Sequence, residues 1–157
     1  MSVTRIAIDA SLACSKRPTG VEHFARSLLS ELVRLDLPDV EWCVYLPPYG
    51  DPGCELPPTV RARYRPDVNT LIKSPWFAAQ TWRDRVDVVY AFGHLFTPAC
   101  RGKYVLTVHD LAFEEYPDCY PAGAPETARA QVRETCRRAS RIVVPSQSTR
   151  QALIASY

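Results

Sequence analysis

Several polar residues that could take part in chemistry stand directly after short apolar runs of the chain. They are Asp9, Ser11, Gly93, His94, His109, Asp110 and Ser146, joined by a Thr19-Gly20 pair that follows a polar loop. In an open parallel sheet, ligands bind beyond the carboxyl ends of the strands. If the apolar runs are strands of such a sheet, we expect these residues to gather along one rim and to form a single site.

His109 and Asp110 form the pair with the clearest chemical potential. An imidazole changes its charge near neutral pH, and an adjacent carboxylate can hold it in place, so the pair could serve acid–base or charge-stabilising chemistry. A histidine at this position could equally be a structural residue that has satisfied its hydrogen bonds. For His94 the structural interpretation is the simpler one.

Thr19-Gly20-Val21-Glu22 fits a capping box at the start of a helix, with Thr19 as the N-cap. Gly20 could relieve crowding where the loop turns in. It could also let an anion approach the N–H groups and the positive end of the helix dipole. Ser146 is most simply an N-cap, although a cap also points N–H groups at the rim.

Common catalytic and metal-binding motifs are missing from the sequence. It contains no G-x-G-x-x-G loop, Walker A loop, G-x-S-x-G elbow or H-E-x-x-H pair. The six cysteines are scattered and form no C-x-x-C pair, so nothing predicts a metal site.

The elements that would position these residues alternate between strand and helix. The expected strands are Arg5–Ala10, Val40–Leu46, Val60–Arg65, Val86–Phe92, Tyr104–Val108 and Arg141–Pro145. The expected helices follow Thr19, run from Pro75 to Arg85 behind a Ser74 cap, run from Pro125 to Ala139, and follow Ser146. This order predicts an α/β fold with a doubly wound, mostly parallel, Rossmann-like sheet.

Composition limits the classes of function. The chain has 157 residues, 46% of them apolar, and a net charge of +2, which fits one globular domain and does not suggest nucleic-acid binding. It shows no signal peptide and no apolar stretch of spanning length. We therefore expect reduced cysteines and a cytoplasmic protein.

Four segments, in the same order, resemble family 4 glycosyltransferases. They are RIAIDASL with RPTGVEHFARSLLSEL, then RVDVVYAFGHLFTP, then YVLTVHDLAFEEYPDCY, and last ASRIVVPSQSTRQAL, together spanning residues 5 to 153. The histidine–aspartate segment is the closest match. Two departures are His23, where arginine is commoner, and Pro145, where valine is usual.

The resemblance implies one half of a GT-B enzyme, a retaining glycosyltransferase that uses a nucleotide-diphosphate sugar as co-substrate and needs no cofactor or bound metal. Thr19 and Gly20 would lie near the donor's diphosphate and His109 near the transferred sugar. Asp110 would hold the histidine loop, Ser146 would cap a helix facing the cleft, and His94 is a further candidate for donor or acceptor binding.

The resemblance also implies that residues 1–157 are the N-terminal, acceptor-side domain, without the C-terminal domain that binds the nucleotide-sugar. We expect no turnover from the chain alone, and we expect the missing domain or a partner chain to complete it. The acceptor would be a carbohydrate or a lipid-linked molecule. The alternative is a non-catalytic α/β binding module derived from that domain.

The helix at 75–85 could also touch the inner face of a membrane. It carries Trp76, Phe77 and Trp82, and the neighbouring strand carries the arginines 61, 63 and 65. Aromatic rings settle at the interface and arginines attract anionic headgroups. The alternative is that the aromatic residues pack the helix against the sheet.

Overall fold

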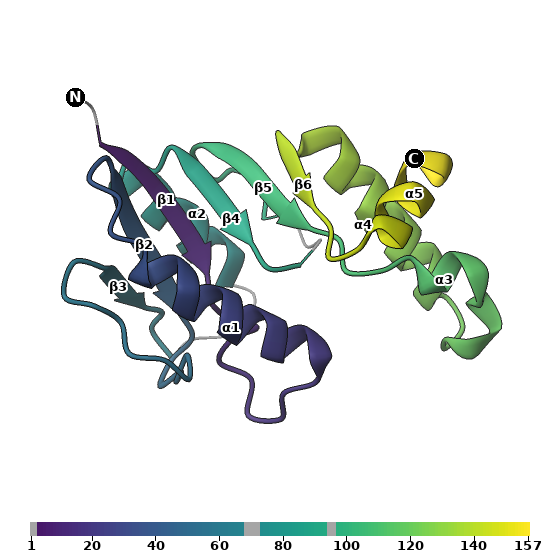
Figure 1. The fold of residues 1–157 in the computed structure, drawn as a ribbon, viewed down its shortest axis with the longest axis horizontal. Helices are drawn as coiled ribbons and strands as arrows, with labels where there is room; N and C mark the ends of the chain where they lie inside the picture. The colour runs from purple at the N-terminus through teal and green to yellow at the C-terminus, as the bar shows by residue number, and fades with distance from the viewer. Residues whose placement is uncertain (1–2, 68–72, 94–96) are drawn as a thin grey trace. The chain divides into compact units, whose positions relative to one another are not determined.

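The computed structural model describes residues 3–67, 73–93 and 97–157 (Figure 1). The chain divides into two compact units. The first unit comprises residues 1–92 and 97–103, and the second comprises residues 93–96 and 104–157.

The first unit is built on four parallel strands. They are β1 (Thr4–Asp9), β2 (Val40–Leu46), β3 (Arg61–Tyr64) and β4 (Val88–Ala91), in the spatial order β3-β2-β1-β4. Ala7 and Ile8 of the central strand are fully buried. Such apolar strands are expected where helices cover both faces of a parallel sheet.

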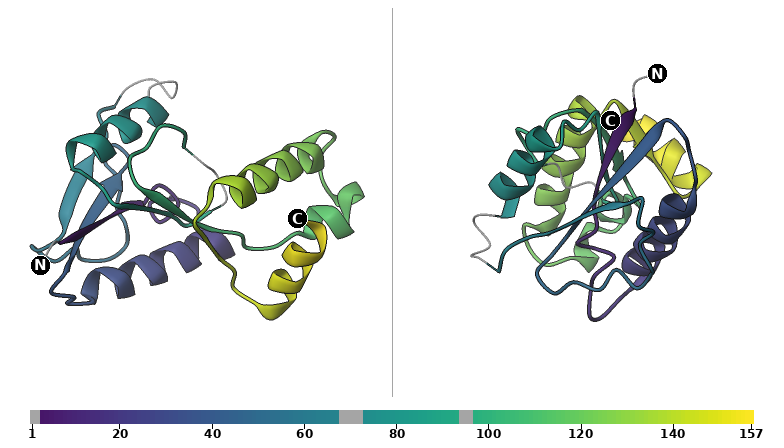
Figure 2. Two further views of the ribbon diagram at one scale, coloured as in Figure 1. Left: turned by 90° about the horizontal axis from the view of Figure 1, so that it is seen from above. Right: turned by 90° about the vertical axis from the view of Figure 1, so that its left-hand side faces the viewer.

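Helices α1 (Gly20–Arg34) and α2 (Lys73–Arg83) lie on opposite faces of this sheet (Figure 2). The spacing of Ala25, Leu29 and Val33 places these three residues on one side of α1, and all three are buried. On α2, Phe77 and Ala78 are buried.

The second unit pairs β5 (Lys103–Thr107) with β6 (Arg141–Val143) in parallel. Its helices are α3 (Ala112–Glu115), the 3₁₀ turn η2 (Pro117–Cys119), α4 (Ala124–Arg138) and α5 (Gln147–Ser156). A small apolar core consists of Val108, Leu111, Phe113 and Val132.

Polar contacts join three helical segments of the second unit. The hydroxyl of Tyr157 donates to the carboxylate of Glu114 in α3, and Nε of Arg129 in α4 donates to the same carboxylate over 2.8 Å. Burial and the hydrogen bond to Glu114 together raise the pKa of Tyr157 to about 12. The carboxylate thus links α3, α4 and the residue that follows α5.

The predicted fold class, an α/β Rossmann-like arrangement with parallel strands, is confirmed. The strand predicted at 40–46 has the expected bounds, whereas those predicted at 86–92 and 141–145 are shorter, ending at Ala91 and Val143. Ser74 was expected to cap the second helix, but α2 begins at Lys73, so Ser74 and Pro75 lie inside its first turn. The short α3 and η2 were not predicted, because a four-residue helix has too few positions to show a periodic pattern.

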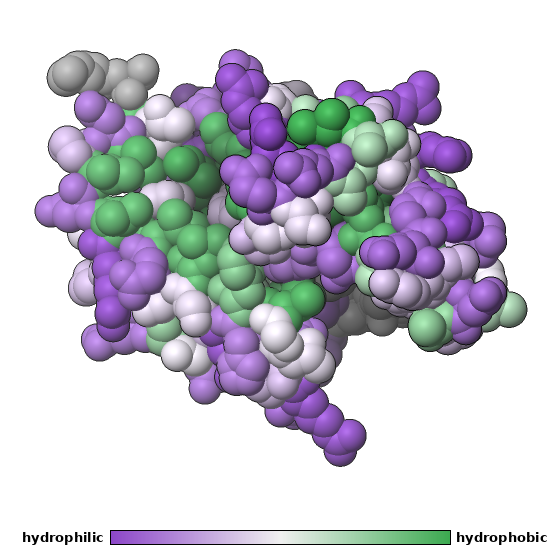
Figure 3. All heavy atoms as spheres, turned by 45° about the vertical axis from the view of Figure 1, so that its right-hand side comes forward, coloured by the Kyte–Doolittle hydropathy of each residue, from purple (hydrophilic) through white to green (hydrophobic). Residues whose placement is uncertain are grey.

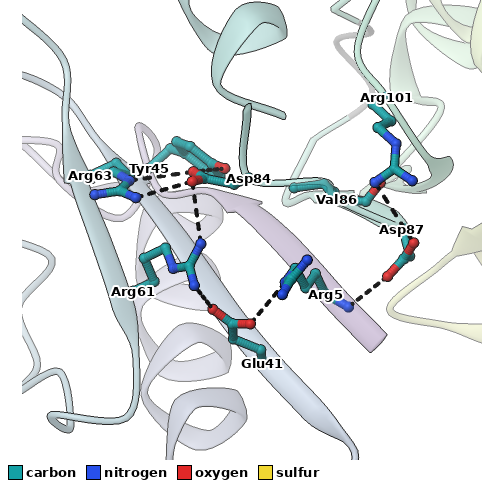
Figure 4. Close-up of polar contacts among 9 residues, drawn as sticks. All are labelled: Arg5, Glu41, Tyr45, Arg61, Arg63, Asp84, Val86, Asp87 and Arg101. Atoms are coloured by element: carbon teal, nitrogen blue, oxygen red, sulfur yellow. Dashed lines mark hydrogen bonds and ion pairs between the residues drawn. The ribbon is translucent and has the colours of Figure 1, made fainter. Parts of the chain in front are cut away.

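A buried carboxylate organises the α2 face of the first sheet (Figure 4). Asp84 follows α2, and its side chain is only 2% exposed. It accepts hydrogen bonds from the Tyr45 hydroxyl (2.8 Å) and from Nη2 of Arg63 (3.0 Å), and Nη1 of Arg61 lies 3.4 Å away. A buried charge of this kind is stable only when it is paired and hydrogen-bonded, and these donors meet that need.

Strand register explains why the donors point the same way. Arg61 lies opposite Cys43, and Arg63 lies opposite Tyr45. Alternate side chains of a strand share one face, so these residues all face α2. The network continues on this face to Glu41, which pairs with Arg61. Arg61 and Arg63 of β3, at the edge of the sheet, therefore bind carboxylates of the same unit.

The network lowers the pKa of Asp84. Burial by itself would raise this pKa, because it disfavours the charged form. The hydrogen bonds from Arg63 and Tyr45, with the positive charges of Arg63 and Arg61, outweigh burial and bring the pKa below its ordinary value. The carboxylate is therefore ionised at neutral pH.

We predict that Asp84→Ala destabilises the protein by about 3 kcal/mol, the lower end of the cost of breaking a buried ion pair, since both arginines are about one-third exposed. Urea unfolding measures the change. Glu31→Ala is the control, because it removes an exposed carboxylate that pairs with Arg34 at 3.6 Å, and it should change stability little. Equal effects of the two substitutions would contradict a central role for Asp84.

The same carboxylate predicts a pH dependence. A lowered folded-state pKa gives stability that is fully present above the unfolded pKa of about 3.9 and is lost as the pH falls through the folded value. The stability difference between wild type and Asp84→Asn should therefore shrink as the pH is lowered below about 4. A difference that stays constant from pH 7 to pH 3 would show that the charge of Asp84 contributes nothing.

Candidate functional site

The carboxyl end of β1 opens into a loop that is anchored at both ends. The Asp9 carboxylate accepts a hydrogen bond from the Ser11 backbone N–H over 3.0 Å. The N–H of Ala10 donates to the carbonyl of Tyr45 over 2.9 Å. Asp9 thus shapes the start of the loop that leads to α1.

Arg26 of α1 holds the same loop from the other side. Its Nε donates to the carbonyl of Ala13 over 2.7 Å, and its Nη2 donates to the carbonyl of Ser15 over 2.6 Å. Gly53, in the loop between β2 and β3, has a φ of +70°, and a Cβ added there would lie 3.2 Å from Cδ of Arg26. Arg26 therefore packs between two loops of the rim. Sequence reasoning missed this role, because Arg26 reads as an ordinary residue of a helix.

The predicted capping box at the start of α1 is confirmed. The Glu22 carboxylate accepts from the Thr19 backbone N–H over 2.8 Å and also contacts the Thr19 hydroxyl. The hydrogen bonds from Thr19 lower the pKa of Glu22. Local sequence was enough to predict this feature, since its partners are three residues apart.

Gly20, the first residue of α1, does not relieve crowding. A Cβ added there would meet nothing within 4 Å among the atoms that the structure describes, and its φ is not positive. Of the two interpretations drawn from the sequence, the one that invokes crowding is wrong. The first turn of α1 is exposed at Gly20. The capping box occupies the N–H groups of Thr19 and Glu22, so the N–H groups of Gly20 and Val21 are the ones left without a partner in the helix.

A small pocket of about 30 Å³ lies beside the ends of β1 and β2. Asp9, Ser11, Tyr45, Arg65 and Trp76 are among the residues that line it. The Tyr45 ring contacts Trp76 and Phe77 edge to face, with ring centroids 6.1 and 5.1 Å apart. Because Asp84 holds the Tyr45 hydroxyl, the polar network also fixes this wall of the pocket.

In the second unit, His109 follows β5 and is half-buried. The hydroxyl of Thr149 donates to the carbonyl of His109 over 3.2 Å, and it also contacts the Ser146 hydroxyl at 2.9 Å. Ser146 caps α5 by accepting from the Thr149 N–H over 3.1 Å. The start of α5 therefore holds the backbone of the histidine loop. Thr149 was not singled out from the sequence, because its partner is 40 residues away.

Asp110 holds the other side of the histidine loop. Its carboxylate accepts from the N–H of Ala112 over 3.0 Å, at the start of α3. The structure thus places His109, Asp110 and Ser146 together within the second unit.

Thr19 and Gly20 lie in the first unit, whereas His109, Asp110 and Ser146 lie in the second. That these residues form one rim stays a prediction. His94, the remaining candidate, lies outside the described residues.

Part of the surface of α2, the helix proposed to touch a membrane, packs inside the first unit. Phe77 is buried and Trp76 is half-buried against Tyr45, while Arg61 and Arg63 pair with Asp84. Trp82 is 63% exposed. Membrane contact stays a prediction, carried by Trp82 and its neighbours rather than by the whole helix.

Apolar side chains also reach the surface in patches on the face drawn in Figure 3. Exposed apolar residues include Leu35 and Leu37 after α1, and Ile154 on α5. Patches of this kind often mark contacts with other proteins or domains.

Among the residues that the structure describes, no cluster of histidine, cysteine, aspartate or glutamate could hold a metal ion. No described helix has the length and apolarity needed to cross a membrane. The six cysteines, all within the described ranges, are free thiols.

Comparison with known proteins gives a match to a protein-family model. No curated protein and no solved structure matches the chain. The model of Glycosyltransferase Family 4 matches residues 18–157, a range that begins one residue before the α1 cap and includes the whole histidine loop. The chain therefore belongs to glycosyltransferase family 4.

Proposed function

We propose that this chain is the acceptor-side half of a retaining glycosyltransferase that transfers a sugar from a nucleotide-diphosphate donor to an acceptor. The observation that carries the proposal is the family match, which covers both the open start of α1 and the anchored His109 loop. In the reaction, the bond between sugar and diphosphate breaks, a glycosidic bond forms, and the acceptor hydroxyl loses its proton.

The start of α1 supports a role in binding the donor. First-turn N–H groups and the helix dipole attract an anion such as a diphosphate, and a residue without a side chain allows close approach. Glu22 adds a negative charge at the same end. A departing diphosphate needs cationic or N–H donors in addition to this helix terminus, and we expect a nucleotide-sugar-binding domain to supply them.

The His109 loop supports a role at the transferred sugar. Thr149 fixes the His109 carbonyl and Asp110 fixes the start of α3, so the imidazole projects from a backbone that is held on both sides. Such preorganisation is what electrostatic stabilisation of a transition state requires. Asp110 acts as a positioning residue in this scheme.

The acceptor is a carbohydrate, free or linked to a lipid. Six free thiols support a cytoplasmic site of action. Where the acceptor is lipid-linked, the exposed Trp82 and the exposed Arg83 and Arg85 are the groups proposed to meet the inner membrane face.

We predict that His109→Ala lowers the rate of sugar transfer by about 100-fold or more, the effect of losing one preorganised group. The assay joins the chain to a nucleotide-sugar-binding domain of the family and follows product formation. Asp118→Ala, an exposed carboxylate on η2, is the control and should transfer at the wild-type rate. A fully active His109→Ala protein would remove His109 from the mechanism, and an inactive wild type would favour a binding module.

We predict that Gly20→Ala raises the KM for the nucleotide-sugar without lowering stability. The added methyl group has space, and alanine favours a helix more than glycine, so the free energy of unfolding should rise by up to about 1 kcal/mol. A bound diphosphate, however, would meet the methyl group. Titration of the donor in the joined protein, with urea unfolding alongside, separates the two effects. An unchanged KM would show that the donor does not approach Gly20.

A further inference from the structure

A shallow groove of about 350 Å³ lies on the first unit, beyond the carboxyl ends of β2 and β3. The residues that line it are Pro48, Tyr49, Tyr64, Arg65, Pro66 and Asp67. They come from two segments, the turn after β2 and the end of β3. The carboxyl ends of parallel strands are where α/β sheets bind ligands.

Two tyrosines dominate the groove, and both are exposed. Tyr49 is 90% exposed and Tyr64 is 56% exposed. Each ring is therefore largely exposed to solvent, and packing within the unit does not account for its presence there. Large aromatic rings in an open groove are suited to bind a ligand with a flat apolar face.

The backbone of Tyr49 is strained. Its φ of 53° lies in the left-handed region, which non-glycine residues rarely adopt. The turn is closed by a hydrogen bond from the Gly50 N–H to the Pro47 carbonyl over 3.1 Å. A glycine would suit the position of Tyr49 better, and the exposed ring gains little from packing. This backbone conformation presents the Tyr49 ring to the groove.

Charged groups in the groove set the chemistry of the ligand. Arg65 and Asp67 supply a donor fork and an acceptor, and their charges cancel. A phosphate polymer or an anionic membrane would meet the carboxylate of Asp67, so a neutral ligand fits better. A sugar ring has an apolar face for a tyrosine and hydroxyl groups for both charged side chains.

Arg65 connects the groove to the pocket beside Asp9. It lines both, and its backbone N–H donates to the carbonyl of Leu46 over 2.9 Å, which fixes it between the ends of β2 and β3. The groove and the pocket are therefore neighbours at this end of the sheet. At about 350 Å³ the groove has room for a sugar ring, whereas the pocket of about 30 Å³ has room only for a water-sized group.

We propose that the Tyr49–Tyr64 groove binds a neutral sugar unit of an oligosaccharide acceptor, at a distance from the reacting end. The inference rests on the proposed function, because it names the class of acceptor that the enzyme uses. Tyr49 and Tyr64 stack on the sugar ring, and Arg65 and Asp67 bind its hydroxyl groups.

The test uses neutral tetrasaccharides of glucose, galactose, mannose and N-acetylglucosamine as probes. Titration of the isolated chain, followed by NMR shifts or calorimetry, should show binding of at least one probe. Tyr49→Gly removes the ring and relieves the backbone, so it should weaken binding about tenfold or more while leaving the thermal midpoint unchanged or raised. Tyr64→Ala should weaken binding similarly.

Tyr116→Ala is the matched control. Tyr116 is 55% exposed, lies in the second unit and lines no part of the groove, so this variant should bind the probe as wild type does. Absence of binding to all four probes overturns the inference. Binding that Tyr49→Gly and Tyr64→Ala leave intact overturns it as well, as does binding to anionic vesicles in place of the sugars.

A second arm separates the inference from the proposed function. In the protein joined to a nucleotide-sugar-binding domain, Tyr49→Gly should raise the KM for the tetrasaccharide about tenfold. Transfer with an unchanged acceptor KM overturns the groove and leaves the proposed function standing. Binding through the two tyrosines without any transfer removes the enzymatic function and leaves a carbohydrate-binding module.

Discussion

The first unit depends on one buried carboxylate, which needs hydrogen-bond donors and positive charges around it. Asp84 carries a negative charge that water does not reach, so its donors must be supplied by the protein. Arg61 and Arg63 supply them from β3, which pairs with β2 alone among the described strands. The charge of Asp84 therefore helps to keep β3 in register with β2. Backbone pairing over only four residues would stabilise this register weakly.

The same carboxylate reaches the candidate ligand site through Tyr45. With its hydroxyl held by Asp84, the ring has one orientation, and in that orientation it contacts Trp76 and Phe77 of α2. These aromatic residues line the pocket beside Asp9. An interaction at the end of α2 thus shapes a binding surface at its beginning, by way of one rigid side chain.

Features with local partners were predictable from the sequence, and features with distant partners were not. The capping box at Thr19 and the Ser146 cap each join residues three apart, and both were predicted. The partners of Asp84 lie 21 to 39 residues away, so no short pattern reveals them. Without that contact, the alternating arginines of β3 suggested a surface for headgroups.

The fold class was predictable because apolar strands and amphipathic helices repeat over many residues. The loop contacts of Arg26 and Thr149 were not, since each depends on where the fold brings a backbone carbonyl.

The position of β1 in its sheet has a consequence for synthesis of the protein. Thr4 pairs with Val40, 36 residues later, whereas Ile6 pairs with Val88, 82 residues later. A growing chain can therefore cover one edge of β1 well before the other. Between the completion of β2 at Leu46 and that of β4 at Ala91, 45 further residues must be made, which takes about 2–9 s at 5–20 residues per second. During that interval an apolar strand presents open hydrogen-bonding groups, the state in which nascent chains pair with one another. This edge of β1 is therefore covered only after β4 has been made.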